Sequence, residues 1–440
     1  MIDRSKGILK EGNKNRLGHQ DIHKIVDLFT RQLEVPRYSR LVSRAEIEAN
    51  DYNLNIPRYI DNSEPEDIQD LTAHLCGGIP NRDLDALEPY WQAFPSLRGE
   101  LFTPAERPSY SMPKLEASQV RAAIRSHPEF QAYQDKVTAL FERWQAQNKD
   151  LLMNIGPGCK PKELIEQLGE SLLAVFSTAG TEDAAAGLID PYALYQRLMD
   201  YWTGVMQDDV YLITGEGWVG AARPRQISED RKGKEKPDLE IGKLKLKADL
   251  IPPALLVARY FAAEQSALDE LNTEAERLEL QLEEMREEHG GEEGLLAEVM
   301  DEKGSISKGV VTKRLKEIQG DREADDECQV LEAYTELLEQ QAEANKRFKG
   351  TKKRLDEQVV NQYGRVTEAE IKMLVVDEKW LTILRGEMTG EMERVSQSLT
   401  GRIKELAERY AAPLSQIIGK TDALKTKVEE HLHKMGLQWY

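Results

Sequence analysis

Lysine and arginine gather between Arg223 and Lys247, the clearest local set of side chains that could bind a ligand. Cationic side chains neutralise phosphates and release counterions, so this segment is a candidate for contact with a nucleic-acid backbone. Five acidic residues are interspersed with the basic ones, and a solvated loop without a ligand remains the alternative. The candidate phosphate contacts are Arg223, Arg225, Arg231, Lys232, Lys243, Lys245 and Lys247.

Methyl transfer to the amino group of adenine would require two other patterns. One is a glycine-rich turn after a strand, where backbone can approach S-adenosylmethionine. The other is Asn or Asp followed by two prolines and an aromatic residue, which bonds the exocyclic amine and stacks on the base. Pro252 and Pro253 follow Ile251, which has no polar side chain, so they predict a helix start. The segments NIGPGCKP and TGEGWVG lack the strand–turn–helix context and predict turns. The sequence therefore predicts no catalytic and no cofactor-binding residue.

Metal and phosphate sites are also not predicted. His19 and His23 lie four residues apart, but no third ligand stands near them. Asp208-Asp209 is typical of a solvated helix end. The residues 419–421 match the end of a phosphate loop, but Leu414 occupies the place of its first glycine, which favours a helix break.

Apolar residues alternate in steps of three and four along two segments, Leu268 to Met285 and Tyr334 to Leu355. This spacing predicts coiled-coil-like helices, and the connector between them allows an antiparallel helical hairpin. Such seams can pack inside the chain or bind a partner helix, and both alternatives stay open. The candidate partner seam is Leu268, Leu271, Leu278, Leu282, Leu399, Ile403 and Leu406.

Composition bounds the class of protein. The chain has 440 residues, a formal net charge of -19 and 31% charged residues. A chain this acidic is not expected to bind DNA by itself, although a local basic stripe could contact the DNA backbone. Three widely spaced cysteines argue against disulfides, and together with the polar N-terminal residues they predict a cytoplasmic location.

Helices are expected to dominate, with a few short strands. The expected helices cover residues 20–32, 117–152 with a split at His127-Pro128, 161–176, a segment opening at Asp190-Pro191, and 381–406. Strands or extended segments are expected at 39–47, 50–60 and 208–213.

Several stretches carry a family resemblance. GNKNRLGHQDIHKIVDLF (12–29), YSRLVSRAEIEANDYNLNIPRYID (38–61) and the HLCGGIP region resemble the end of the methyltransferase domain of type I restriction-modification M (modification) subunits, which are N-6 adenine DNA methyltransferases. The segments 190–213 and 247–265 resemble the helical region that follows. LVVDEKWLTILRGEM and VSQSLTGRIKELAERYAAPL resemble the C-terminal tail of longer members.

The resemblance implies a mainly α fold, with a remnant of the end of an α/β methyltransferase domain followed by a helical region and long coiled-coil-like helices. The expected domains are 1–61 (end of the methyltransferase-like domain), 62–260 (mostly helical, with the basic loop 223–247), 261–362 (coiled-coil-like hairpin) and 363–440 (C-terminal helices).

The resemblance also implies partners. In the family, M subunits bind a specificity (S) subunit that reads DNA, and a motor-nuclease (R) subunit can join this bacterial defence complex. The sequence departs from the family by lacking the S-adenosylmethionine turn and the Asn-Pro-Pro-aromatic motif. The expectation is therefore an assembly part of an M subunit, inactive alone, with the cofactor belonging to the complete subunit. A free-standing helical scaffold without a role in methylation is the rival hypothesis.

Overall fold

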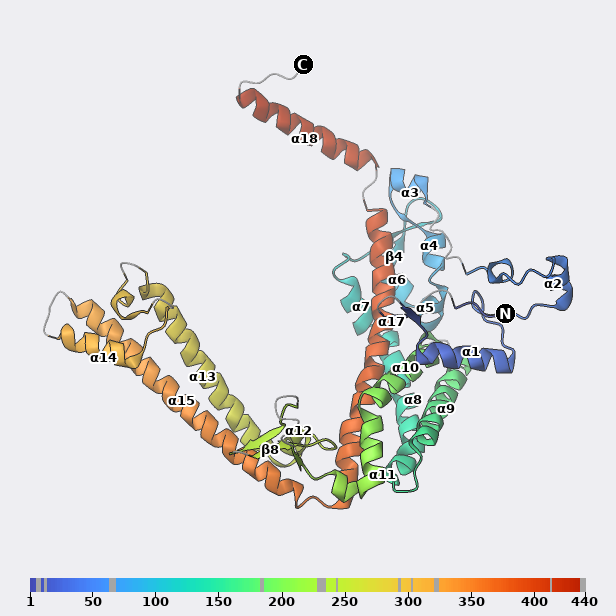
Figure 1. Ribbon diagram of the computed structural model, residues 1–440. Helices are drawn as coiled ribbons and strands as arrows, with labels where there is room; N and C mark the ends of the chain where they lie inside the picture. The colour runs from blue at the N-terminus through green and yellow to red at the C-terminus, as the bar shows by residue number, and fades with distance from the viewer. Residues whose placement is uncertain are drawn as a thin grey trace. The chain divides into compact units, whose positions relative to one another are not determined.

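Helices predominate in the computed structural model (Figure 1). It describes residues 1–4, 9–11, 14–62, 69–182, 186–227, 235–242, 244–291, 294–301, 304–319, 324–411 and 414–435. The chain forms two compact units. The first consists of Met1–Tyr211 together with Trp380–Tyr440, and the second consists of Leu212–Lys379. Because the sheets of the described residues have only two or three strands each, the prediction of a mainly α fold is confirmed.

The first unit is a helical body with two small sheets. Its helices are α1 (His19–Arg31), α2 (Arg44–Ala49), α3 (Leu71–Cys76), α4 (Asn81–Asp85), α5 (Glu88–Ala93), α6 (Leu97–Leu101), α7 (Val120–Ser126), α8 (Pro128–Met153), α9 (Pro161–Glu182), α10 (Pro191–Tyr201), α17 (Thr382–Arg409) and α18 (Leu414–Lys434). A π-helical turn, η3 (Trp202–Met206), continues α10 into α11 (Gln207–Ala221). The strands are β1 (Leu9–Glu11), β2 (Lys14–Arg16), β3 (Ile79–Pro80), β4 (Phe102–Pro104) and β5 (Tyr110–Pro113), paired as β1-β2 and β3-β5-β4.

Local caps explain why the long helices start where they do. His127 separates α7 from α8, and its Nδ1 accepts a hydrogen bond from the Glu129 N–H at 3.2 Å. Pro128 fits the first turn of α8 because its missing N–H would have no helical partner there. Asp190 caps α10 by accepting from the Tyr192 N–H at 2.9 Å. These helix starts were predicted from the same residues.

The core of the first unit lies along α8, α9, α10 and α17. Apolar residues of α8 recur at helical spacing and are buried; they are Phe130, Tyr133, Val137, Phe141 and Trp144. The Trp144 indole donates to Ser171 Oγ on α9 at 2.9 Å, which fixes the ring while its area is removed from water.

Three predicted segments differ from the structure. Residues 39–47 contribute only Ser39 to isolated bridges, and α2 follows because the Ser43 hydroxyl caps the Glu46 N–H at 3.2 Å. Pro57 lies within a 3-10 turn, Ile56–Arg58, near its N-terminus, where proline is tolerated. The predicted strand 208–213 is the start of α11, in which Val210 and Ile213 are buried three residues apart, as on one helical face.

Two glycine segments also differ. Residues 214–220, predicted as a turn, lie in α11, where Gly217 takes φ 72° and kinks the helix. Residues 419–421, predicted as a helix break, lie inside α18. The sequence also predicts a helix start at Ser63 and a last helix that ends at Trp439-Tyr440, and these residues lie outside the described ones.

The second unit is dominated by two long helices. Its elements are β6 (Arg225–Gln226), β7 (Leu239–Ile241), β8 (Leu244–Lys247), α12 (Pro253–Tyr260), α13 (Ala262–His289), the 3-10 turn η5 (Ala297–Val299), α14 (Lys308–Glu317), α15 (Asp325–Tyr363), α16 (Glu368–Lys372) and the π-helix η7 (Met373–Leu381), which extends to the first unit's residues. The sheet order is β6-β8-β7, with both pairs antiparallel.

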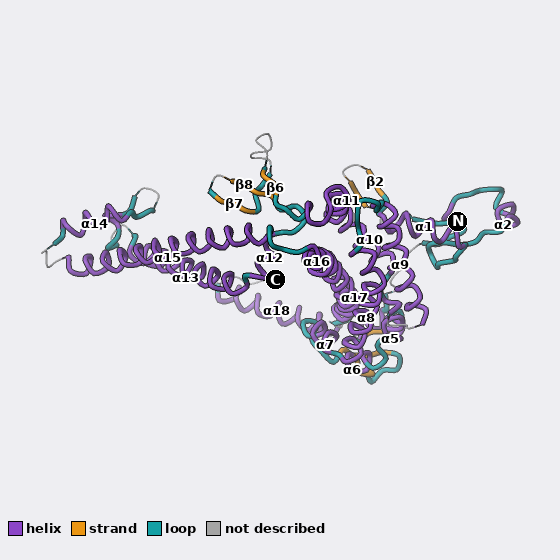
Figure 2. The backbone as a smooth tube through the Cα atoms, turned by 90° about the horizontal axis from the view of Figure 1, so that it is seen from below, coloured by secondary structure: helices purple, strands orange, loops and turns teal. Residues whose placement is uncertain are grey.

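α13 and α15 lie side by side in both views (Figures 1 and 2) and run antiparallel; we call this pair the hairpin. Leu278 packs with Ala344 in the middle of the hairpin, and Leu282 packs in a cluster with Leu331 and Tyr334 farther out. Among the described residues, no helix is long and apolar enough to span a membrane.

Candidate nucleic-acid and partner interfaces

Pro252 and Pro253 have a structural role at the start of a helix. Pro253 opens α12, and the preceding Ile251 is buried, with its carbonyl accepting the Tyr363 hydroxyl at 2.6 Å. Burial raises the pKa of Tyr363 above its usual range, which keeps this hydroxyl a proton donor. The prediction that Pro252 and Pro253 start a helix is confirmed.

The prediction that Asp208-Asp209 is a solvated helix end is wrong for Asp209, which lies in the first turn of α11 and makes a hydrogen bond inside the fold. Asp209 is buried and accepts the indole N–H of Trp380 at Oδ2, 2.8 Å away. Within the described part of the chain, no group of three or more His, Cys, Asp or Glu side chains could hold a metal ion.

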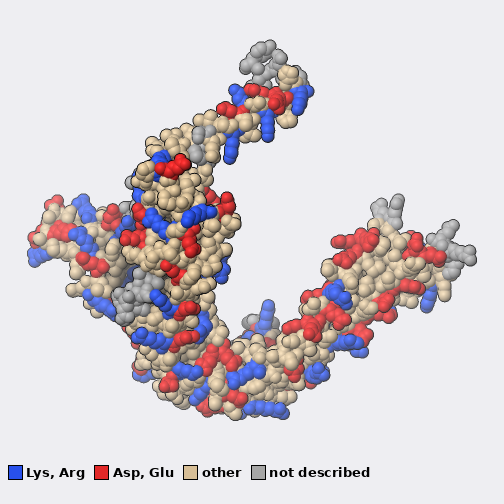
Figure 3. Space-filling model, turned by 180° about the vertical axis from the view of Figure 1, so that it is seen from behind, with Lys and Arg blue, Asp and Glu red and all other residues tan. Residues whose placement is uncertain are grey.

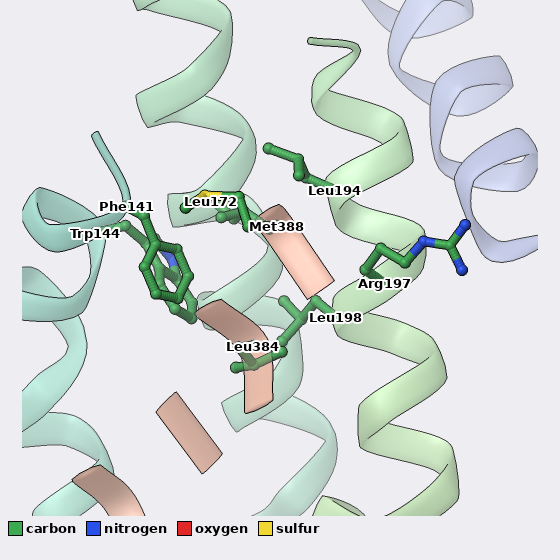
Figure 4. A pocket seen from close by; sticks show the side chains of 8 residues that line it. All are labelled: Phe141, Trp144, Leu172, Leu194, Arg197, Leu198, Leu384 and Met388. Carbon is green, nitrogen blue, oxygen red and sulfur yellow. The ribbon is translucent and has the colours of Figure 1, made fainter. Parts of the chain in front are cut away.

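A small cavity lies in the helical core of the first unit (Figure 4). Its volume is about 20 Å³, and it is lined by Phe141, Trp144, Leu172, Leu194, Arg197, Leu198, Leu384 and Met388. Arg197 is held at its edge by Glu391, with Nε 2.8 Å from Oε1. A space of this size holds about one water molecule, so it cannot accommodate a nucleoside cofactor.

Described basic residues of the predicted segment are paired with acids that lie in or beside the β6-β8-β7 sheet. Arg225 bonds Glu235 at 2.8 Å and Asp249 at 2.6 Å, and these hydrogen bonds raise its pKa. Lys247 pairs with Asp238 at 2.7 Å.

The other candidate phosphate contacts differ in their surroundings. Lys245 pairs with Glu240 at 3.3 Å, and Arg223 is exposed. Arg231, Lys232 and Lys243 lie outside the described residues. Phosphate contact by this segment stays a prediction, and its described part presents little unpaired positive charge.

The predicted partner seam is mostly buried within the chain. Leu268, Leu278 and Leu282 are buried on α13, where the last two pack against α15. Leu271 is half-buried. On α17, Leu399, Ile403 and Leu406 are buried. A partner helix would have to displace these contacts, so their role in partner binding stays a prediction.

α1 docks onto α9 and α10 through directional polar contacts. The Tyr192 hydroxyl donates to Asp27 Oδ2 at 2.5 Å, and burial together with this bond raises the pKa of Tyr192. His23 Nε2 lies 3.3 Å from Glu170 Oε1 on α9. A neighbouring face of α1 carries apolar side chains that remain exposed in the described structure; they are Ile22, Val26 and Phe29.

α18 presents an apolar surface that was not predicted from the sequence. Leu414, Ile417, Ile418, Leu424 and Val428 recur at helical spacing, and each is exposed. The period of three and four residues was available as a signal, but the expected helix break at 419–421 interrupted it. An amphipathic helix without a cover on its apolar face is typical of an interaction surface.

Comparison with known proteins finds similarity in the first residues of the chain. Residues 1–68 match the family model described as N-6 DNA Methylase. The chain is 41% identical over 61 residues to the type I restriction enzyme MjaVII methylase subunit of Methanocaldococcus jannaschii. It is 37% identical over 66 residues to the type I restriction enzyme MpnII methylase subunit of Mycoplasma pneumoniae.

These matches are short. They cover 14% and 15% of this chain, and 11% and 12% of the two relatives. No solved structure matches the chain. The resemblance predicted from residues 12–61 is confirmed: residues 1–68 are similar to the N-6 DNA methylase family model and to two type I methylase subunits.

Proposed function

We propose that this chain is an assembly part of a type I methylase subunit, which supports adenine-N6 methylation of DNA in complex with a specificity subunit and a motor-nuclease subunit. The observation that carries the proposal is the attachment of α1, inside the family-matched residues, to the helical body through α9 and α10. In this arrangement the family-matched helix α1 is attached to the helical body, whose other helices we propose to bind partners.

The chemistry would come from elsewhere in the complex. The sequence has no Asn-Pro-Pro-aromatic motif and no cofactor turn. The residues therefore suit positioning and assembly, with the cofactor held by a catalytic domain on the same polypeptide or on another one.

α18 supports the partner half of the proposal. Its exposed apolar positions at helical spacing suit docking against another helix of similar pattern. A specificity subunit is the partner that the family resemblance suggests for such a helix.

The test combines association with methyl transfer. The purified chain is incubated with duplex DNA and labelled S-adenosylmethionine, alone and after co-expression with each specificity subunit of the same genome. We expect no methyl transfer by the chain alone, and co-elution with a specificity subunit in size-exclusion chromatography. Robust methylation by the chain alone would overturn the proposal. Self-association without binding to any specificity subunit would favour the free-standing scaffold.

A further inference from the structure

One face of α15 carries a dense set of positive charges. Six of the nine residues from 346 to 354 are basic, and none is acidic. All six side chains are exposed, and we call this set the basic face; it consists of Lys346, Arg347, Lys349, Lys352, Lys353 and Arg354. At 1.5 Å per residue they cover about 12 Å of helix.

The rest of the hairpin is acidic, which sets the basic face apart. α13 has ten acidic residues and two arginines, and residues 325–343 of α15 have seven acidic residues and no basic one. Figure 3 shows Asp and Glu covering much of the outer end of the hairpin. The change of sign within one helix is not a consequence of overall composition, since the chain carries a net charge of -19.

The basic face is only partly neutralised. Arg347 and Lys353 each pair with a glutamate one helical turn away, at 2.5 and 3.9 Å. The other four make no ion pair with the described residues. Lys352 acts on Asp356 at longer range, because burial raises the pKa of that carboxyl and Lys352 counteracts the rise.

The arrangement is unfavourable for the isolated helix. Lys346 and Lys349 are three residues apart and Lys349 and Lys353 four apart, and like charges at these spacings destabilise a helix by about 0.2–0.5 kcal/mol per pair. Gly350 lies between them, where a side chain would meet nothing within 4 Å, and glycine inside a helix costs about 1 kcal/mol relative to alanine. Among the described residues, no atom lies close enough to position 350 to require a glycine there.

We propose that the basic face of α15 contacts the phosphate backbone of duplex DNA. Positive side chains close together on the exposed side of a helix release counterions from a phosphate backbone, and a glycine among them lets the helix come close. Every residue of α15 is described, and none of its large apolar side chains is exposed. A protein interface has an apolar core, so a polyanion fits this face better than a protein partner does. The inference rests on the proposed function, because it assigns a DNA contact to that complex.

The first experiment measures binding of the full chain to a fluorescent duplex of about 30 base pairs by anisotropy, at several salt concentrations from about 50 mM upward. The test variant combines Lys346→Gln, Lys349→Gln and Lys352→Gln. The control variant combines Lys162→Gln, Lys316→Gln and Lys420→Gln, three exposed lysines dispersed along the chain.

We expect the test variant to bind more than about tenfold more weakly at about 50 mM salt, and its slope of log K against log salt to fall by roughly 2 to 3, because each phosphate contact contributes about 0.9. The control variant carries the same change of net charge and should keep the slope. Equal behaviour of the two variants, or no binding by the unmodified chain, would overturn the proposal. Loss of self-association with unchanged DNA binding would also overturn it and assign the face to a second copy.

A second pair of variants removes the concern of misfolding. Gly350→Glu places an acid in the basic face, whereas Gly350→Gln adds similar bulk without charge, and both should strengthen the helix. We expect Glu to weaken DNA binding much more than Gln does, and equal effects would contradict a phosphate contact. Because none of these titrations includes a specificity subunit, their failure leaves the association test of the proposed function standing.

Discussion

Gly169 of α9 and Tyr195 of α10 are in such close contact that a methyl group on the glycine would stand 2.5 Å from Cε2 of the tyrosine ring. The same ring meets the imidazole of His23 edge-on, with 4.6 Å between the centroids. The missing side chain at position 169 therefore lets α10 present the ring on which α1 docks.

Gly169→Ala should destabilise the first unit by about 1–3 kcal/mol, because the added methyl forces the Tyr195 ring or the helices apart. Urea unfolding followed by circular dichroism measures the change. Gly390→Ala on α17 is the matched control, since nothing lies within 4 Å of its new methyl. It should be neutral or stabilise the chain by up to about 1 kcal/mol. Equal effects of the two substitutions would contradict the close packing.

Trp380→Phe should lower stability by about 1–3 kcal/mol, because the buried Asp209 carboxylate loses the indole donor at 2.8 Å and the smaller phenyl ring leaves part of the buried site unfilled. Thermal unfolding measures the loss. Asp209→Asn keeps an oxygen that accepts the indole N–H and should cost less. Unfolding of Trp380→Phe at the temperature of the unmodified chain would show that the bond contributes nothing.

Asp70→Ala should destabilise α3 by about 1 kcal/mol at pH 7, because Asp70 caps the helix. Its carboxylate accepts the Ala73 N–H at 2.9 Å and the Tyr110 hydroxyl at 3.2 Å. The bond from Ala73, with smaller contributions from Tyr110 and Arg82, holds the pKa of Asp70 below its usual value.

The pH dependence of this effect follows from the direction of the shift. A carboxyl whose pKa is lower in the folded state contributes its full stability above the unfolded pKa of about 3.9, and loses it as pH falls through the folded pKa. The difference between the unmodified chain and Asp70→Ala should therefore shrink between about pH 4 and pH 2. For Asp70→Asn, which retains a cap that does not ionise, the difference from Asp70→Ala should stay constant over this range.

Leu424→Asp on α18 should leave folding unchanged, because the leucine is 61% exposed, while it weakens association with a specificity subunit by more than about tenfold. Co-elution and calorimetric titration with that subunit measure the effect. Thr426→Asp introduces the same charge on the other side of α18 and should bind normally. If both variants bind normally, the apolar face of α18 is not the docking surface.

The sequence predicts helix starts well where the capping residues are adjacent to the helix. His127-Pro128 and Asp190-Pro191 begin α8 and α10 as expected, because a cap involves residues only two or three positions apart. The run Asp208–Ile213 is rich in residues that favour strands, yet it is helical. It continues α10 through the π-helical turn, and buried Val210 and Ile213 fit one helical face.

The partners of charges and seams could not be predicted, because they are distant in sequence. Arg225 is neutralised by Asp249, 24 residues farther along the chain. A heptad pattern identifies the apolar face of a helix but not what covers it, and Leu278 proves to face Ala344 of the same chain. By contrast, the charge density of residues 346–354 was visible in the sequence and was missed beside the longer basic segment 223–247.

The hairpin carries two separate apolar clusters, and this has a consequence for how the chain opens. The outer cluster joins the ends of α13 and α15 to α14 and η5, through Leu296, Val299, Ile306 and Val311, while Leu278 and Ala344 belong to the inner cluster. Proteins unfold locally in cooperative units, and each separately packed apolar cluster tends to open as one such unit. The amides of the outer cluster should therefore exchange with solvent hydrogen as one group, at a lower opening free energy than those of the inner helices, so that the end of the hairpin unfolds and refolds while its base stays intact.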